Sequence, residues 1–237
     1  MKSALLSIDK ATGGHPIGYV VDLRSNPGGL LDQAVDVADD FLESGEVVSQ
    51  RGRTKDDIER YYARPGDMAH GLPVIVLTDA GTASASEIVA GALQDHRRAL
   101  IMGETSFGKG SVQTVVQTGP DAALRLTTAR YYTPSGRSVQ AGGIQPDIEV
   151  PQLTDPDYKN RRYIREADLR KHLLAQSKVD DKLLETDTTP DPRFTAKAED
   201  LKKQGIKDFQ LRYALDTLKR LAAPAAVAGG STSKKSR

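Results

Sequence analysis

A small hydroxyl residue, Ser84, stands where an apolar run gives way to a helical pattern. Residues 72–77 are typical of a buried strand, and apolar residues from Ile88 onward then recur at the spacing of one helix face. Ser84 is therefore expected in a first helical turn, where free N–H groups and the helix dipole favour negative charge. This setting suits a nucleophile whose reaction builds an oxyanion. It equally suits a helix cap, because Ser84 and Glu87 have capping-box spacing.

Lys109 offers a base for such a nucleophile. It lies just before an apolar segment, and a strand is predicted over residues 108–118. With a side-chain period of two, Lys109 and Gln113 would point to one face of that strand. A lysine turned inward would lose its hydration, which favours the neutral amine that acts as a base, and Gln113 could hold it in position. The alternative is a solvent-facing lysine in a glycine-rich turn.

A second loop could complete such a site. Gly28 and Gly29 lie between a strand predicted over residues 17–23 and a helix predicted over residues 30–42. Glycines let the backbone approach a ligand closely and aim N–H groups at it, as an oxyanion hole requires. A simple tight turn is the alternative.

Two other chemistries fit less well. Residues 103–110 have the glycine spacing of a phosphate-binding loop, but Gly110 stands where a hydroxyl residue should follow the lysine. A strand rather than a helix is also expected next. The four histidines lie at turns, in polar loops, at a helix end or in the charged tail, without an obvious carboxylate mate. A Ser-His-Asp triad is therefore weakly supported.

Composition excludes several classes of protein. The 237 residues carry 33 basic and 32 acidic side chains and only 5% aromatic residues, which argues against a nucleic-acid partner. The absence of cysteine excludes disulfides, a thiol nucleophile and thiolate metal sites. No apolar run approaches the roughly 18 residues of a membrane span, and the first residues do not read as an export signal.

The elements that must position these residues alternate between strand and helix to about residue 150. This alternation predicts an α/β domain with a mostly parallel sheet flanked by helices. The charges of the later helical patterns, over residues 158–178 and 196–221, are interpreted as solvated helix faces. We therefore divide the chain into a catalytic core over 1–152, a charged helical C-terminal extension over 153–221, and a disordered tail over 222–237.

Taken together, these segments resemble the carboxyl-terminal processing (tail-specific) serine peptidases. The resemblance covers about residues 1–152 and rests on four blocks in the family's order. The blocks are GYVVDLRSNPGG at 18–29, GTASASEIVAGALQD at 81–95, GETSFGKGSVQ at 103–113, and TPSGR at 133–137 followed by GIQPD at 143–147. Their joint occurrence is far more specific than any one block.

The resemblance implies a serine endopeptidase that uses a Ser-Lys dyad and no metal or cofactor. Ser84 would be the nucleophile, Lys109 the base and Gln113 the orienting amide, while Ser86 supports them. The fold implied is an α/β core akin to the ClpP/crotonase group.

The oxyanion donors implied by the resemblance are the Ala85 amide and one amide from the Gly28–Gly29 turn. Substrates would be proteins or peptides cleaved near their C-termini in the periplasm or another extracytoplasmic space. An activating adaptor or a homo-oligomer would be a further partner. Family members normally carry an export signal or anchor and a PDZ domain before this core, and from the given sequence we expect neither. Two alternatives therefore stay open: a non-catalytic peptide- or partner-binding scaffold, and a crotonase-like acyl-CoA enzyme.

Overall fold

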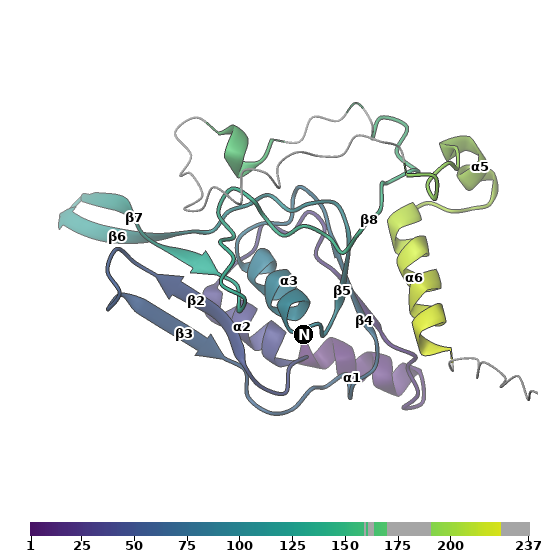
Figure 1. Cartoon of the computed structure of the whole chain (residues 1–237), viewed down its shortest axis with the longest axis horizontal. Helices are drawn as coiled ribbons and strands as arrows, with labels where there is room; N and C mark the ends of the chain where they lie inside the picture. The colour runs from purple at the N-terminus through teal and green to yellow at the C-terminus, as the bar shows by residue number, and fades with distance from the viewer. Residues whose placement is uncertain (159, 161–163, 170–190, 224–237) are drawn as a thin grey trace, which may run out of the picture.

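The computed structural model of the chain describes residues 1–158, 160, 164–169 and 191–223. Two four-stranded sheets and the helices around them make up the fold (Figure 1). The helices are α1 (Lys2–Ala11), α2 (Leu31–Asp39), α3 (Ala85–Asp95), the 3-10 turn η1 (Glu166–Asp168), α5 (Ala198–Lys203) and α6 (Phe209–Ala222). The strands are β1 (Tyr19–Asp22), β2 (Glu46–Arg51), β3 (Ile58–Tyr62), β4 (Val74–Thr78), β5 (Leu100–Gly103), β6 (Ser111–Gly119), β7 (Ala122–Tyr132) and β8 (Ile148–Glu149).

The first sheet is parallel throughout, with the strand order β1-β4-β5-β8. Its strand β4 is buried on both faces. Val74 and Val76 belong to the core that includes residues of α2 and α3, whereas Ile75 and Leu77 belong to a second core with residues of α6. Successive side chains of a strand point to opposite faces, so a strand covered on both sides must be apolar throughout. This explains the unbroken apolar run of β4.

The second sheet is antiparallel throughout, with the order β3-β2-β7-β6. The prediction of a mostly parallel sheet is therefore correct only for the first sheet. The chain connections give the reason: β2–β3 and β6–β7 are joined by short segments, which can link antiparallel strands but not parallel ones. Most residues of the β6–β7 hairpin are exposed, and its tip projects from the body of the molecule (Figure 1).

Helix α6 covers one face of the parallel sheet. Its buried side chains include Ala214 and Leu218, which pack with Ile75 and Leu77 of β4. The charges predicted to be solvated therefore occupy only one side of α6. The apolar side of the helix packs on the parallel sheet and completes the second core. Among the described residues, no helix is both long and apolar enough to cross a bilayer.

Two predictions fall largely outside the described residues. Of the helical pattern predicted over residues 158–178, the structure describes 158, 160 and 164–169, which include η1. Of the tail predicted over 222–237, it describes only residues 222 and 223.

Candidate active site

Ser84 lies at the carboxyl edge of the parallel sheet. It follows β4 and is the N-cap of α3, as its sequence position predicts. Its backbone has a φ of 57°, in the left-handed region that non-glycine residues rarely occupy. Such strain persists only where the surroundings hold it, and it is common at functional sites. The loops that follow β1 and β5 end at the same edge, because parallel strands share their direction.

The loop after β1 packs directly on the Ser84 turn. A β-carbon placed on Gly28 would lie 2.7 Å from both the carbonyl oxygen of Ala83 and the amide nitrogen of Ala85. With a φ of 95° as well, only glycine fits at this position. The amide of Ala83 donates to the carbonyl oxygen of Asn26 at 3.0 Å, which ties the two segments together. The structure therefore brings the glycine turn and the first residue of α3 side by side.

The backbone amides of the glycine turn and of the first residue of α3 differ in whether they already donate a hydrogen bond. The Gly28 amide donates to the Asn26 side-chain oxygen at 3.0 Å. In the described part of the chain, the amides of Gly29 and Ala85 donate to no protein group. The Ala85 amide is free because the first N–H groups of a helix have no partner within it. These two amides are thus available to an anionic ligand.

Asp79 fixes the relation of the two loops. Its carboxylate accepts hydrogen bonds from the amide of Ser25 at 2.7 Å and from the amide of Gly81 at 2.9 Å. The buried hydroxyl of Thr82 donates to the carbonyl oxygen of Leu23 at 2.8 Å. The bonds to Ser25 and Leu23 cross from the β4–α3 turn to the residues that follow β1, so they hold the two loops together.

Lys109 lies in the loop between β5 and β6, partly exposed, and not in a strand. The strand begins at Ser111, and a bulge interrupts its register between Val112 and Gln113. Lys109 and Gln113 therefore do not share a strand face, contrary to the prediction, because the side-chain period of two does not run unbroken from one to the other. Gln113 is exposed and pairs with Thr127 of β7.

Glu87 connects the Ser84 turn to the Lys109 loop, a contact that the sequence analysis missed. Its side chain is fully buried. One carboxylate oxygen, Oε2, accepts hydrogen bonds from the amides of Ser84 at 2.7 Å and Lys109 at 2.8 Å. The other, Oε1, accepts from the Ser106 hydroxyl at 2.5 Å and the Gly108 amide at 2.7 Å. Burial raises the pKa of Glu87 to about 7, against the opposing effect of these bonds. The only sequence signal was the capping-box spacing, which reports just the Ser84 contact.

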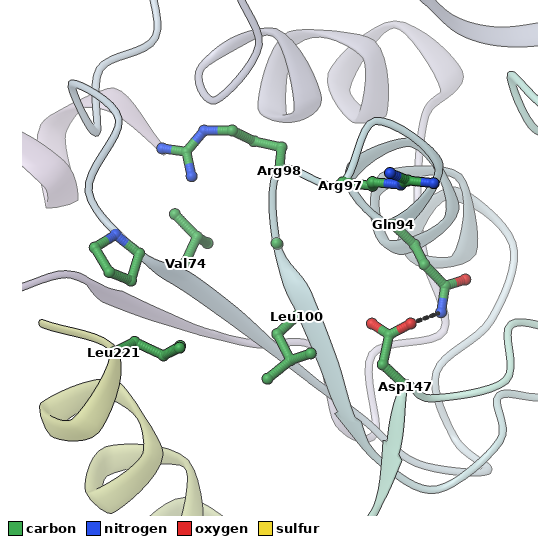
Figure 2. A pocket seen from close by; sticks show the side chains of 9 residues that line it. Val74, Gln94, Arg97, Arg98, Leu100, Asp147 and Leu221 are labelled. Atoms are coloured by element: carbon green, nitrogen blue, oxygen red, sulfur yellow. Dashed lines mark hydrogen bonds between the residues drawn. The ribbon is translucent and has the colours of Figure 1, made fainter. Parts of the chain in front are cut away.

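Hollows in the surface lie away from these residues. A pocket of about 330 Å³ is lined by Val74 and Leu100, the first residues of β4 and β5, and by Leu221 of α6 (Figure 2). It therefore lies at the amino edge of the parallel sheet, opposite Ser84. A second hollow is lined by residues of the antiparallel sheet and the β2–β3 connection. In the described part of the chain, no three His, Cys, Asp or Glu side chains are grouped to hold a metal.

Comparisons with known proteins identify the family of the chain. A family model described as Peptidase family S41 matches residues 1–150. A carboxy-terminal-processing protease of Bartonella bacilliformis is 57% identical over 164 residues, which are 69% of this chain and 38% of that protein. A carboxyl-terminal-processing protease of Synechocystis is 42% identical over 135 residues, which are 57% of this chain and 31% of that protein. The solved structure of a photosystem II D1 C-terminal processing protease matches with a TM-score of 0.58 at 35% identity, covering 70% of this chain and 43% of that one.

The chain belongs to peptidase family S41. This confirms the resemblance drawn from the four sequence blocks. The curated relatives named here are carboxyl-terminal processing proteases, and the chain spans less than two fifths of the length of either.

Proposed function

We propose that this chain is the catalytic core of a serine endopeptidase that cleaves proteins near their C-termini by a Ser-Lys dyad. The observation that carries the proposal is the shared contact of Ser84 and Lys109 with one oxygen of Glu87. The two backbone nitrogens can be no farther apart than the sum of those two hydrogen-bond lengths. A serine and a lysine whose backbones are held so close can place hydroxyl and amine within reach of each other.

In the first half of the reaction, the Ser84 hydroxyl oxygen attacks the scissile carbonyl carbon while neutral Lys109 takes the hydroxyl proton. The carbonyl oxygen becomes an anion, which the Ala85 amide and an amide of the glycine turn stabilise. Because the Gly28 amide is engaged with Asn26, we assign the second donor to Gly29. The protonated lysine then gives its proton to the leaving amine as the C–N bond breaks, which leaves an acyl-enzyme.

In the second half, Lys109 takes a proton from water, whose oxygen attacks the acyl carbon. The tetrahedral anion collapses, the proton returns to the Ser84 oxygen and the new carboxyl product leaves. Gln113 is proposed to orient the lysine; because it is exposed in this structure, that role requires its side chain to turn toward Lys109. The proposed reaction uses no metal or cofactor at any step.

The setting of the reaction is also a proposal. The relatives' names support protein substrates processed at their C-termini. We propose an extracytoplasmic site of action, such as the periplasm, and an activating adaptor or homo-oligomer as a partner. The nucleophile at the start of α3, beside a parallel sheet, also supports the ClpP/crotonase-like relationship of the core.

A fluorophosphonate probe tests the chemistry directly. We expect the probe to label the wild-type chain at Ser84, found by peptide mass spectrometry, and Ser84→Ala to lose the label. Lys109→Ala should lose at least about 100-fold in labelling rate and peptidase turnover, because dyad members act as a unit. The exposed Lys55 supplies a matched control, Lys55→Ala, which should behave as wild type.

The alternatives give different results in the same assay. A peptide-binding scaffold would retain C-terminal peptides without any label on Ser84. An acyl-CoA enzyme would require CoA substrates and also form no serine adduct. Near-normal turnover by Lys109→Ala would rule out the dyad.

A further inference from the structure

We infer that the ionised carboxylate of Glu87 is the positioning group that holds the nucleophile turn and the base loop together in the active arrangement. The inference rests on the proposed function and adds a residue to its machinery. Glu87 accepts hydrogen bonds from the backbone amides of Ser84 and Lys109, so it acts through those two backbones. A helix cap alone would need only the Ser84 contact.

In the described part of the chain, each hydrogen-bond partner of the Glu87 carboxylate is a donor. Three are backbone amides, which cannot accept a proton. The fourth is the hydroxyl of Ser106, which donates to Oε1 while its oxygen accepts a bond from the Ile144 amide at 2.7 Å. A protonated carboxyl would have to give up one of these bonds to place its own hydrogen. The contact set therefore matches the anion.

The charge is compensated by dipoles rather than by a cation. Among the described residues, Glu87 forms no ion pair, although it is fully buried in the first turn of α3. The amides of the lysine loop and the positive end of the helix dipole face it instead. The one ionisable side chain among the residues that it contacts is Lys109, and the contact is to the backbone amide of that residue. Such a site is rigid, because any opening leaves a buried anion unsatisfied.

The arrangement of the bonds explains why this contact matters for catalysis. The Ser84 and Lys109 amides share Oε2, whereas Gly108 and Ser106 are held by Oε1. Both oxygens therefore bind the lysine loop, and one of them also binds the nucleophile turn. Misplacing a reacting group by about 1 Å can cost on the order of 100-fold in rate. Loss of the carboxylate should thus lower kcat while leaving substrate affinity nearly unchanged.

Glu87→Gln is the central variant, because it keeps the size of the side chain and turns one oxygen into an NH₂ donor that faces N–H groups. We expect kcat to fall about 100-fold with KM within about twofold. Ser106→Ala keeps both bonds to Oε2 and should lose about 10-fold or less. Glu43→Gln changes a carboxylate that accepts hydrogen bonds from the amides of Gly66 and Asp67 at 3.2 and 3.0 Å, outside the segments of Ser84 and Lys109, and serves as the control for a carboxylate that only ties a loop. It should keep kcat within about threefold.

Two readouts separate positioning from general stability. The kcat of the wild-type protein should rise with pH through about 7 as Glu87 ionises, and Glu87→Gln should lack this limb of the profile. Amide hydrogen exchange, measured at one pH on folded protein, should show that Glu87→Gln loses protection in both segments 82–88 and 105–111. A merely structural cap would affect the first segment only.

The outcomes are distinguishable. If Glu87→Gln keeps wild-type kcat and pH profile, or if exchange rises in one segment alone, the inference is overturned. If the wild-type chain shows no Ser84 labelling, the proposed function fails, whatever the exchange data say about the link between the loops. Reduced kcat, a lost pH limb and joint deprotection together support the inference.

Discussion

Gly28 and Ser84 are in direct contact: a β-carbon added to Gly28 would lie 3.1 Å from the β-carbon of Ser84. The same atom would lie 2.7 Å from the Ala85 amide nitrogen, a proposed oxyanion donor. The glycine turn therefore lies against the candidate site, and its close approach is possible only without a side chain.

The first prediction concerns this contact. Gly28→Ala should lower peptidase kcat and the rate of fluorophosphonate labelling by about 100-fold or more, because the turn must move away from the oxyanion donors. The left-handed φ adds about 1–3 kcal/mol of strain, which thermal melts should reveal. Gly119→Ala is the control, since its β-carbon meets nothing within 4 Å. Wild-type activity in Gly28→Ala would show that the turn does not belong to the site.

The second prediction concerns the pH dependence of stability at Glu87. Its pKa in the folded protein, about 7, is above the ordinary carboxyl value of 4.5. A raised acid pKa means that the folded state binds the proton more tightly, so this contribution to stability is complete below about pH 4.5 and is lost as pH rises through about 7. The free energy of unfolding of the wild-type protein should fall by about 3 kcal/mol relative to Glu87→Gln over that range.

Urea titrations of both proteins at several pH values measure this difference. Parallel curves for the two proteins would contradict the prediction. The ionised form of Glu87 lowers the stability of the fold because it is buried. It is nevertheless the form that accepts hydrogen bonds from all four donors.

The third prediction concerns the link between α6 and the loop after β1. The guanidinium of Arg24 donates to both oxygens of Asp208, at 3.0 and 2.7 Å, and to Asp22 at 2.6 Å. Burial raises the pKa of Asp208, but the bonds that it accepts from Arg24, Gln152 and Leu211 outweigh burial and lower the pKa to about 2. A lowered pKa gives stability that is present above about pH 4 and is lost as pH falls through about 2.

Asp208→Asn should therefore lower the free energy of unfolding at pH 7 by about 1–2 kcal/mol, since solvent partly screens the pair. Its deficit relative to wild type should shrink between pH 4 and pH 2, as measured by denaturant titration. Asp216→Asn, whose carboxylate pairs with Arg212 on the exposed face of α6, is the matched control with less than about 0.5 kcal/mol expected. A constant deficit at all pH values would argue against the ion pair.

The fourth prediction concerns the division of the chain at residue 152. Leu218 of α6 packs in the core with Leu77 and Met102, so Leu218→Ala should cost about 2–4 kcal/mol. Leu221→Ala on the same helix should cost less than about 1 kcal/mol, because its side chain is half exposed. Equal effects would mean that α6 is only loosely attached. A core that ends at residue 152 should expose Ile75 and Leu77 and aggregate, which gel filtration would detect.

Local patterns in the sequence determined a large part of this protein. The apolar run of β4, the helical spacing after Ser84 and the paired glycines are each properties of a few neighbouring residues, and the structure has all three. The order of the four blocks along the chain also sufficed to place it in its family. Periodicity and turn chemistry act within single elements, so they can be recognised in the sequence before the fold is known.

The tertiary structure decided what those elements bring together. Strand β6 begins only at Ser111 and contains a bulge, so Lys109 and Gln113 do not lie on one strand face. The bounds of β6 depend on its pairing with β7, which the local sequence does not show. The apolar side of α6 packs on the parallel sheet, whose second face would otherwise be exposed to water. Glu87 shows the division most clearly. Its spacing from Ser84 predicted a local cap, whereas its bond to Lys109 depends on β4 and β5 lying side by side, which places their following loops at one edge.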